Sequence, residues 1–194
     1  MKTNIGCIAA LLLCLAGCTT VSPPLPEGAV AMAPGLALQL PAPDSLGRSV
    51  EVVQNVVARY GSQTLAFEGR ISATPDGFVM VCSDALGRRA VSVNWTKTGV
   101  VYDVADWVPA SLRPQNMLAD LIVMYWPQDV VSAAMPGATV TTSATGRTVV
   151  QDGKVLMQVT YAPAHSGDIW SGQTRYHNNL WNYSLTIDQA ALEP

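Results

Sequence analysis

The chain has 194 residues, of which 49% are hydrophobic and 13% charged, and its formal net charge is −3. This length suits one domain with a tail, and low charge density together with five Trp and six Tyr argues against a disordered chain. Eleven Lys and Arg against fourteen Asp and Glu leave no basic excess, so the composition argues against nucleic acid as a partner.

The first predicted element is an export signal. Ile5–Ala16 is apolar at eleven of its twelve positions and follows Lys2, but it is shorter than the roughly 20 residues of a membrane span. Leu15-Ala16-Gly17-Cys18 then matches the bacterial lipobox, in which the Cys is acylated and becomes the mature N-terminus. We therefore expect residues 1–17 to be a signal peptide, and we expect acyl chains on Cys18 to anchor the exported protein in a membrane.

The segment after the lipobox is predicted to be a tether. Residues 18–43 contain six prolines, which fix φ and remove hydrogen-bond donors, so an extended lipidated N-terminus is expected, with Leu36–Leu40 apolar enough to dock onto the domain. Thr19 stands where an Asp would hold a lipoprotein at the inner membrane, which favours the outer membrane with the domain in the periplasm. Cys82 is the one free thiol left in the mature chain, and its alternating strand face predicts a buried, inert group.

Residues 44–194 are expected to form a single domain, in which the hydrophobic period from residue 50 onward is two. Turn signals such as Asp76-Gly77 and Asp152-Gly153 predict antiparallel strands joined by hairpins, with one polar and one apolar face. Ser49–Tyr60 also fits a helical face, but its β-branched valines favour a strand. We expect about ten strands in all, with a loop over Pro163–Gly172 and a closing strand around Trp181–Ile187.

One segment breaks this pattern. Pro114 suits a first helical turn, and apolar residues recur at helical spacing from Met117 to Tyr125, before Trp126-Pro127 ends the helix. A short second helix is predicted over residues 128–135. The predicted fold class is therefore α+β, a curved antiparallel half-barrel with a helical insertion that acts as a plug or a lid.

Catalytic and metal-binding patterns are weak. The mature chain has only His165 and His177, twelve residues apart, and no Cys or carboxylate lies at a metal-ligand spacing near both. Ser166 and Asp168 lie too close to His165 along one loop for a catalytic triad, and there is no nucleophile-elbow motif. We expect no catalytic residues, no metal and no cofactor, and therefore no enzyme.

Bulky apolar residues instead gather on the predicted inner face of the sheet and on the helix. One interpretation is a core closed by its own side chains, and the other is a concave apolar surface that accepts a lipid-like ligand. The sequence leaves both open. The candidate cargo-binding residues are Met80, Trp95, Tyr102, Leu118, Ile122, Tyr125, Trp126, Met157, Tyr161, Trp181 and Tyr183.

Three short motifs resemble a family of uncharacterised bacterial outer-membrane lipoproteins. They are Leu118-Ala119-Asp120-Leu121 with Trp126-Pro127 at the helix end, Val159-Thr160-Tyr161, and the closing Asn179–Ile187 strand. Members of that family often lie in gene clusters for aryl-polyene pigments, and their fold looks like the half-barrel of the Lol-pathway lipoprotein carrier and receptor. The resemblance implies three acyl chains on Cys18 and brings no catalytic residues.

Two functions follow as expectations. The first is an outer-membrane lipoprotein that binds or hands on a lipid-linked apolar cargo, in aryl-polyene export or display. The alternative is a structural or adaptor envelope lipoprotein with a closed core, whose partner is another envelope protein. Neither of the two is enzymatic.

Overall fold

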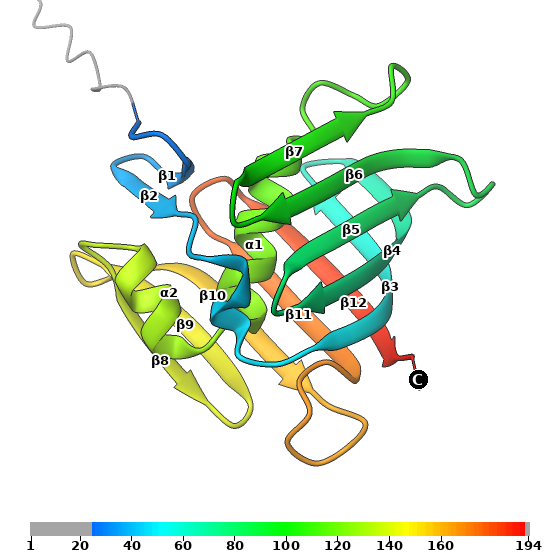
Figure 1. Cartoon of the computed structure of the whole chain (residues 1–194). Helices are drawn as coiled ribbons and strands as arrows, with labels where there is room; N and C mark the ends of the chain where they lie inside the picture. Colours follow the sequence, from blue (N-terminus) through cyan, green and yellow to red (C-terminus); the bar gives the residue numbers. More distant parts are fainter. Residues whose placement is uncertain (1–24, 193–194) are drawn as a thin grey trace, which may run out of the picture.

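The structure is a computed structural model that describes residues 25–192 (Figure 1). The predicted signal peptide, the lipid-attachment site Cys18 and the sorting residue Thr19 lie outside the described residues. Twelve strands, one short 3₁₀ helix and two α-helices make up the described part. None of the helices in this part is long and apolar enough to cross a membrane.

Ten strands form one antiparallel sheet in the order β7-β6-β5-β4-β3-β12-β11-β10-β9-β8. Two meanders, β3–β7 and β8–β12, are joined by the long β3–β12 pair, in which Val57 faces Thr186. The edge strands β7 and β8 do not pair with each other within the described residues, so the curved sheet is an open half-barrel, as predicted. The strands are β3 (Val50–Tyr60), β4 (Gln63–Thr74), β5 (Gly77–Ser83), β6 (Arg89–Thr96), β7 (Gly99–Val104), β8 (Thr139–Ser143), β9 (Gly146–Gln151), β10 (Lys154–Ala162), β11 (Gly172–Asn178) and β12 (Tyr183–Ala191).

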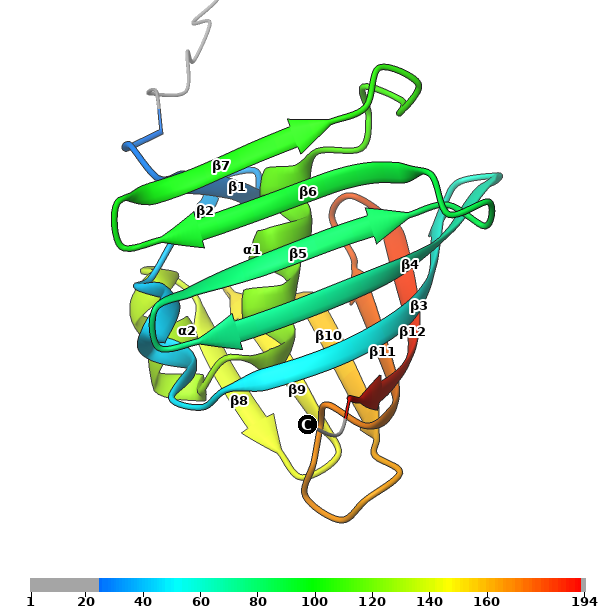
Figure 2. The same ribbon diagram turned by 45° about the vertical axis from the view of Figure 1, so that its right-hand side comes forward.

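The two helices follow the sequence prediction closely. Helix α1 spans Pro114–Tyr125 and α2 spans Gln128–Ala134, with the Trp126-Pro127 break between them. Figure 2 shows α1 crossing the concave side of the curved sheet, where its apolar residues are covered. Ser49–Tyr60, which also fitted a helical face, is strand β3, because its pairing with both β4 and β12 satisfies its backbone groups.

The two ends of α1 are held by polar contacts from distant elements. The side-chain amide of Asn116 donates to the carbonyl of Ala31 at 2.9 Å. At the other end the Arg147 guanidinium donates to the carbonyls of Val123 (2.5 Å) and Trp126 (2.8 Å), and the Tyr161 hydroxyl donates to that of Met124. These donors satisfy carbonyls that a helix end leaves unpaired, and the Arg charge suits the negative end of the helix dipole.

The predicted tether differs from the structure over Ala29–Gln39. Strands β1 (Ala29–Ala33) and β2 (Leu36–Gln39) form a hairpin around the Pro34-Gly35 turn, and a 3₁₀ helix follows at Pro43–Leu46. The prolines fall in the turn and around the strands, while Met32 and Leu38 are fully buried in the core. Composition favoured an extended tether, but the burial of alternate apolar side chains stabilises a hairpin.

Strand β11 was not among the predicted strands. Its inward positions include Thr174 and Asn178, and these buried polar residues hide the usual alternation of apolar and polar side chains. Asn178 donates to the carbonyl of Met32 at 3.2 Å, and Thr174 accepts from Gln189 at 3.1 Å. The closing strand begins at Tyr183 rather than Trp181, because a turn with Asn182 at φ +49° joins β11 to β12.

Candidate functional site

A cavity of about 510 Å³ lies between α1 and the inner face of strands β3, β4, β5 and β12. Such a volume is typical of a small-molecule site. Its wall is mainly apolar, with a few polar groups. The lining residues are Gln54, Val56, Ala58, Arg59, Tyr60, Gln63, Leu65, Phe67, Gly69, Met80, Cys82, Ser111, Leu112, Arg113, Asn116, Met117, Asp120, Leu121, Met124, Trp181, Tyr183, Leu185 and Ile187.

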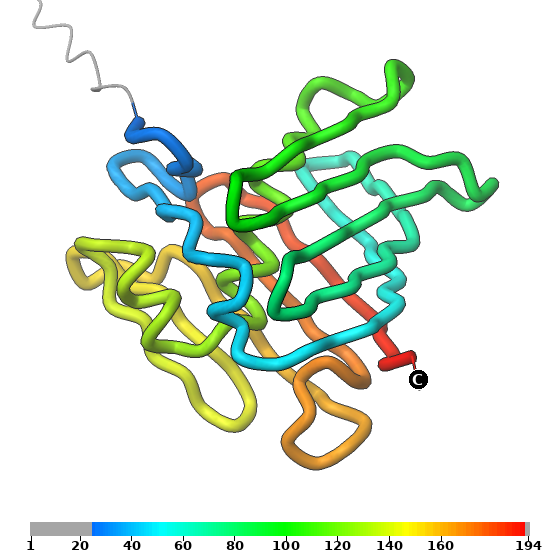
Figure 3. The backbone as a smooth tube through the Cα atoms, viewed as in Figure 1, coloured from blue at the N-terminus to red at the C-terminus, as the bar shows by residue number. Residues whose placement is uncertain are grey.

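The cavity opens at the edge of the sheet where the β3–β4 and β11–β12 turns meet. The register pairs Tyr60 with Tyr183, so these two turns lie side by side, as the tube in Figure 3 shows along its upper edge. Tyr60 at this edge is 61% exposed, whereas Ile187 and Met124 at the inner end are 1% exposed. The cavity therefore has a solvent-facing mouth and a buried floor.

Helix α1 gives one wall of the cavity. Arg113, just before the helix, lies at the mouth, and Met117, Asp120, Leu121 and Met124 follow at helical spacing toward the floor. At 1.5 Å of rise per residue, this wall runs about 16 Å from Arg113 to Met124.

The neighbouring face of α1 belongs to a closed core. The ring of Trp126 lies 5.9 Å from that of Phe78 and 5.9 Å from that of Trp95, and its indole N–H donates to Ser45 at 3.1 Å. Tyr125 stacks on Trp170 with ring centroids 4.2 Å apart. One helix thus separates a filled interior from an open one.

The candidate cargo-binding residues divide between these two regions. Met80, Trp181 and Tyr183 line the cavity. Tyr102 is half-buried on the edge strand β7 and does not line it. The other seven are at most 4% exposed and do not line the cavity: Trp95, Leu118, Ile122, Tyr125, Trp126, Met157 and Tyr161.

Alternation in strands identified which side chains point inward, but it does not say which side of the inserted helix they meet. For this reason the sequence analysis named core residues together with cavity residues. It also missed several cavity residues whose pattern was visible: Leu65, Phe67, Met117, Leu121 and Leu185. Asp120, the one acidic residue of the described lining, was named only as part of the Leu118-Ala119-Asp120-Leu121 motif and not as a site residue.

Asp120 is 5% exposed and lies on the α1 wall between Met117 and Met124. The Tyr183 hydroxyl donates to its carboxylate, at 2.8 Å from Oδ1 and 2.6 Å from Oδ2. Burial disfavours the charged form and raises the pKa of Asp120 to about 7, although hydrogen bonding to Tyr183 opposes that shift. The cavity therefore holds a carboxyl group that changes charge near neutral pH.

Two tyrosines adjoin this carboxyl group. Tyr176 packs against Tyr183 with ring centroids 5.8 Å apart, and its buried hydroxyl has no hydrogen-bond partner within residues 25–192. Burial, together with the charge of Asp120, raises the pKa of both phenols. Both hydroxyls therefore stay protonated at neutral pH.

Cys82 also lines the cavity, and its thiol is buried as predicted. Burial raises its pKa to about 12, so the nucleophilic thiolate is scarce at neutral pH.

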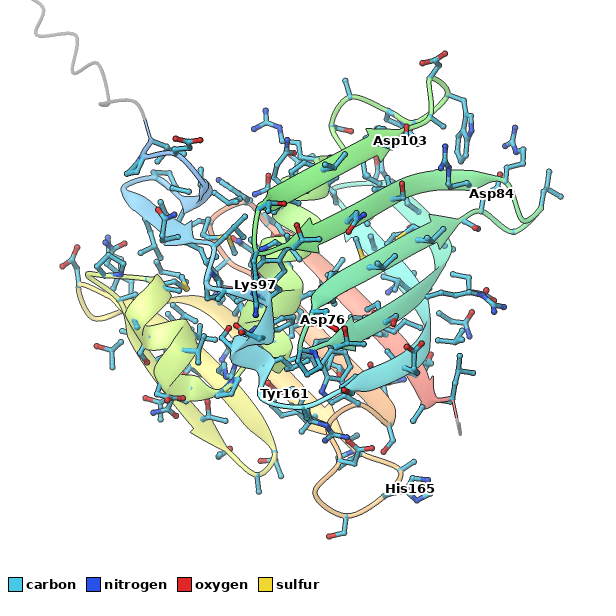
Figure 4. The ribbon with its side chains drawn as sticks, in the orientation of Figure 1. Asp76, Asp84, Lys97, Asp103, Tyr161 and His165 are labelled. Carbon is cyan, nitrogen blue, oxygen red and sulfur yellow. The ribbon has the colours of Figure 1, made fainter. Side chains whose placement is uncertain are left out.

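The loop that carries His165 is far from the cavity. Figure 4 shows the His165 side chain pointing away from the body of the protein at the lower edge. Asp168 on the same loop is ion-paired with Arg48 at 3.6 Å. Within residues 25–192 no three His, Cys, Asp or Glu side chains gather as metal ligands would.

Comparison with known proteins identifies a family. The sequence profile of a family described as "Protein of unknown function (DUF3261)" matches residues 51–191, which is most of the chain. The chain belongs to the DUF3261 family. No curated protein matches this DUF3261 member significantly.

Solved structures with a similar fold include that of a LolA superfamily protein from Nitrosomonas europaea. The match has a TM-score of 0.45 and 8% sequence identity, and it covers 79% of this DUF3261 chain and 90% of the other chain.

Proposed function

We propose that this protein is a non-enzymatic envelope lipoprotein that binds a lipid-like, apolar ligand in the cavity between α1 and strands β3, β4 and β12. The observation that carries the proposal is the open, mainly apolar cavity of about 510 Å³, which no side chain of the described residues fills, although the other side of α1 is packed in the core. A domain that needed only a stable core would gain free energy by filling this space, because each unfilled void forfeits contacts.

The chemistry of the lining supports binding rather than catalysis. The described lining contains no His, and the thiol of Cys82 is held neutral by burial. Asp120 accepts a hydrogen bond from Tyr183, and no Ser, Thr or Lys of the described part of the chain is hydrogen-bonded to it. These groups can orient a ligand, but they do not form an activated nucleophile.

The location and cargo come from the sequence. We propose that Cys18 carries acyl chains that anchor the protein in the outer membrane, with Thr19 favouring that membrane and the domain in the periplasm. The cargo would be a lipid-linked apolar molecule, such as an aryl-polyene lipid during its export or display, which the protein receives or hands on. A long apolar chain fits a deep cavity with one open end.

Binding is tested on the full mature chain, residues 18–194 with Cys18→Ser, titrated with a fluorescent fatty acid. We expect Ala58→Trp, which places an indole inside the cavity, to weaken binding by about tenfold or more, which is ~1.4 kcal/mol or more. The matched control is Ala66→Trp, because Ala66 lies on the neighbouring strand with its side chain exposed on the outer face. If Ala58→Trp and Ala66→Trp weaken binding equally, or if neither changes it, the cavity is not the binding site.

Absence of binding by the unsubstituted chain would instead favour the adaptor function, with another envelope protein as partner.

The lipid anchor is tested by separate experiments. Cys18→Ala should abolish incorporation of a palmitate analogue and leave the precursor at the inner membrane, whereas Thr19→Asp should move the mature protein toward the inner membrane in a sucrose gradient. Equal labelling of Cys18→Ala and the unsubstituted chain, or an unchanged gradient profile for Thr19→Asp, would contradict the anchoring proposal.

A further inference from the structure

The wall of the cavity contains a charge that a purely apolar ligand does not need. Asp120 lies among the apolar residues Met117, Leu121 and Met124 on the cavity side of α1. A carboxylate buried without full pairing is costly, and another apolar side chain would serve a plain hydrocarbon better. Its presence calls for a polar group on the ligand.

The hydrogen-bonding capacity of this carboxylate is largely unused. A carboxylate has about four acceptor sites, but here both oxygens share the single proton of the Tyr183 hydroxyl. No Lys, Arg or His of the described residues forms an ion pair with Asp120. Acceptor sites therefore remain available on a group that lines the cavity.

Charges at the mouth have the opposite sign. Arg59 and Arg113 are exposed there, and neither has an ion-pair partner within residues 25–192. Asp120 is seven residues beyond Arg113, which places it about 10 Å further along the helix. A ligand that enters with its apolar end first would pass the two cationic groups at the mouth and bring its donor group to Asp120, the acidic group of the described lining.

We propose that the natural ligand is an amphiphile that carries a hydrogen-bond donor, a hydroxyl or an amine, which Asp120 binds inside the cavity while an apolar end fills the floor. This inference rests on the proposed binding function and specifies its ligand. Hydroxyl and amine share the chemistry of donation, and the test distinguishes them.

The test compares dodecylamine, dodecanol and dodecanoate, measured by titration calorimetry at pH 8 on the mature chain with Cys18→Ser. We expect the amine and the alcohol to bind about tenfold more tightly than the carboxylate, because only they can donate to Asp120. Asp120→Asn, which keeps an acceptor but removes the charge, should abolish the preference for the amine over the alcohol. Asp120→Leu should lower the affinities for dodecylamine and dodecanol to those expected from their hydrocarbon chains alone. If dodecanol binds more tightly than dodecylamine in the unsubstituted chain, the donor is a hydroxyl.

Two controls keep the results separable. Asp188→Asn changes an exposed Asp of the same strand as Tyr183 and should leave every affinity unchanged. At pH 5 the preference for the amine should fall, since burial raises the pKa of Asp120 to about 7. The other polar or titratable groups that line or adjoin the cavity are Gln54, Arg59, Tyr60, Gln63, Cys82, Ser111, Arg113, Asn116, Trp181, Tyr183 and Tyr176. Burial raises the pKa of the Cys82 thiol and of the Tyr176 and Tyr183 phenols.

If the unsubstituted chain binds all three probes equally, or prefers dodecanoate, the inference about Asp120 is overturned while the binding function stands. An Asp120→Asn variant with the original preference would overturn it as well. If none of the probes binds, the binding function itself fails. Far-UV circular dichroism of the two Asp120 variants shows whether each is folded, and the Asn variant alone suffices if the Leu variant is not.

Discussion

The two sides of helix α1 differ in what they do for the protein. On one side Trp126, which ends the helix, lies against Phe78 and Trp95 in a buried aromatic cluster, and on the other Met117, Leu121 and Met124 face the cavity. The helix was predicted to be either a plug or a lid, and the structure gives it two different faces. Stability and binding should therefore respond to substitutions on different faces of the same helix.

The largest expected effect comes from the filled side. Trp126→Ala should reduce the free energy of unfolding by about 3–5 kcal/mol, because it leaves a void among rings that cannot all relax. Met117→Ala, on the half-buried cavity side, should cost about 1 kcal/mol, since the removed atoms border space that is already open. Urea unfolding measures both values. Equal losses for the two variants would contradict the division of the helix into two faces.

The second prediction concerns pH. The pKa of Asp120 is about 7 in the folded protein and 3.8 when unperturbed, so between these values the folded state binds the extra proton. The contribution of Asp120 to stability is fully present below about pH 4 and is lost as pH rises through 7, with a slope of at most about 1.4 kcal/mol per pH unit. We expect Asp120→Asn to flatten the plot of the free energy of unfolding against pH between pH 4 and pH 8, as measured by urea unfolding. Parallel plots for the variant and the unsubstituted protein would contradict the raised pKa of Asp120.

A smaller loss of stability is expected at the C-terminal end of α1, where Tyr161 of β10 donates to a helix carbonyl. Tyr161→Phe removes the hydroxyl that donates to the Met124 carbonyl and should reduce the free energy of unfolding by about 1–2 kcal/mol. The ligand affinity should remain unchanged, because Tyr161 does not line the cavity. If Tyr161→Phe weakens ligand binding without reducing the free energy of unfolding, Tyr161 contributes to the ligand site and not to the core.

The smallest expected effect is the alkylation of Cys82 in the native protein, because this residue lines the cavity but is only 2% exposed. With its pKa raised to about 12, only about one thiol in ten thousand is ionised at pH 8. We expect no alkylation by iodoacetamide in the native mature chain with Cys18→Ser, and complete reaction after unfolding in urea. Rapid native alkylation, followed by mass spectrometry, would show that the cavity is wetter than its lining suggests.

Local sequence patterns were enough to predict the elements around the site. The period of two, the Asp-Gly turns and the Pro114 start with the Trp126-Pro127 stop predicted most of the strands and both helices. These signals act over a few residues, through φ restriction, turn geometry and the side on which a side chain projects. Strand β11 and hairpin β1–β2 were missed because their stability comes from distant partners, such as Met32 for Asn178.

By itself, the sequence determined the α+β class, the antiparallel meander, the helical insertion and the inward direction of residues such as Met80 and Tyr183. Only the tertiary structure decided which inward side chains pack against one another and which enclose a space. That outcome depends on how far α1 lies from each part of the curved sheet, a distance set by many side-chain volumes at once and by contacts such as Arg147 with Val123. Asp120 shows the same limit, because its proximity to Tyr183 and its raised pKa arise only when β12 and α1 meet across the cavity.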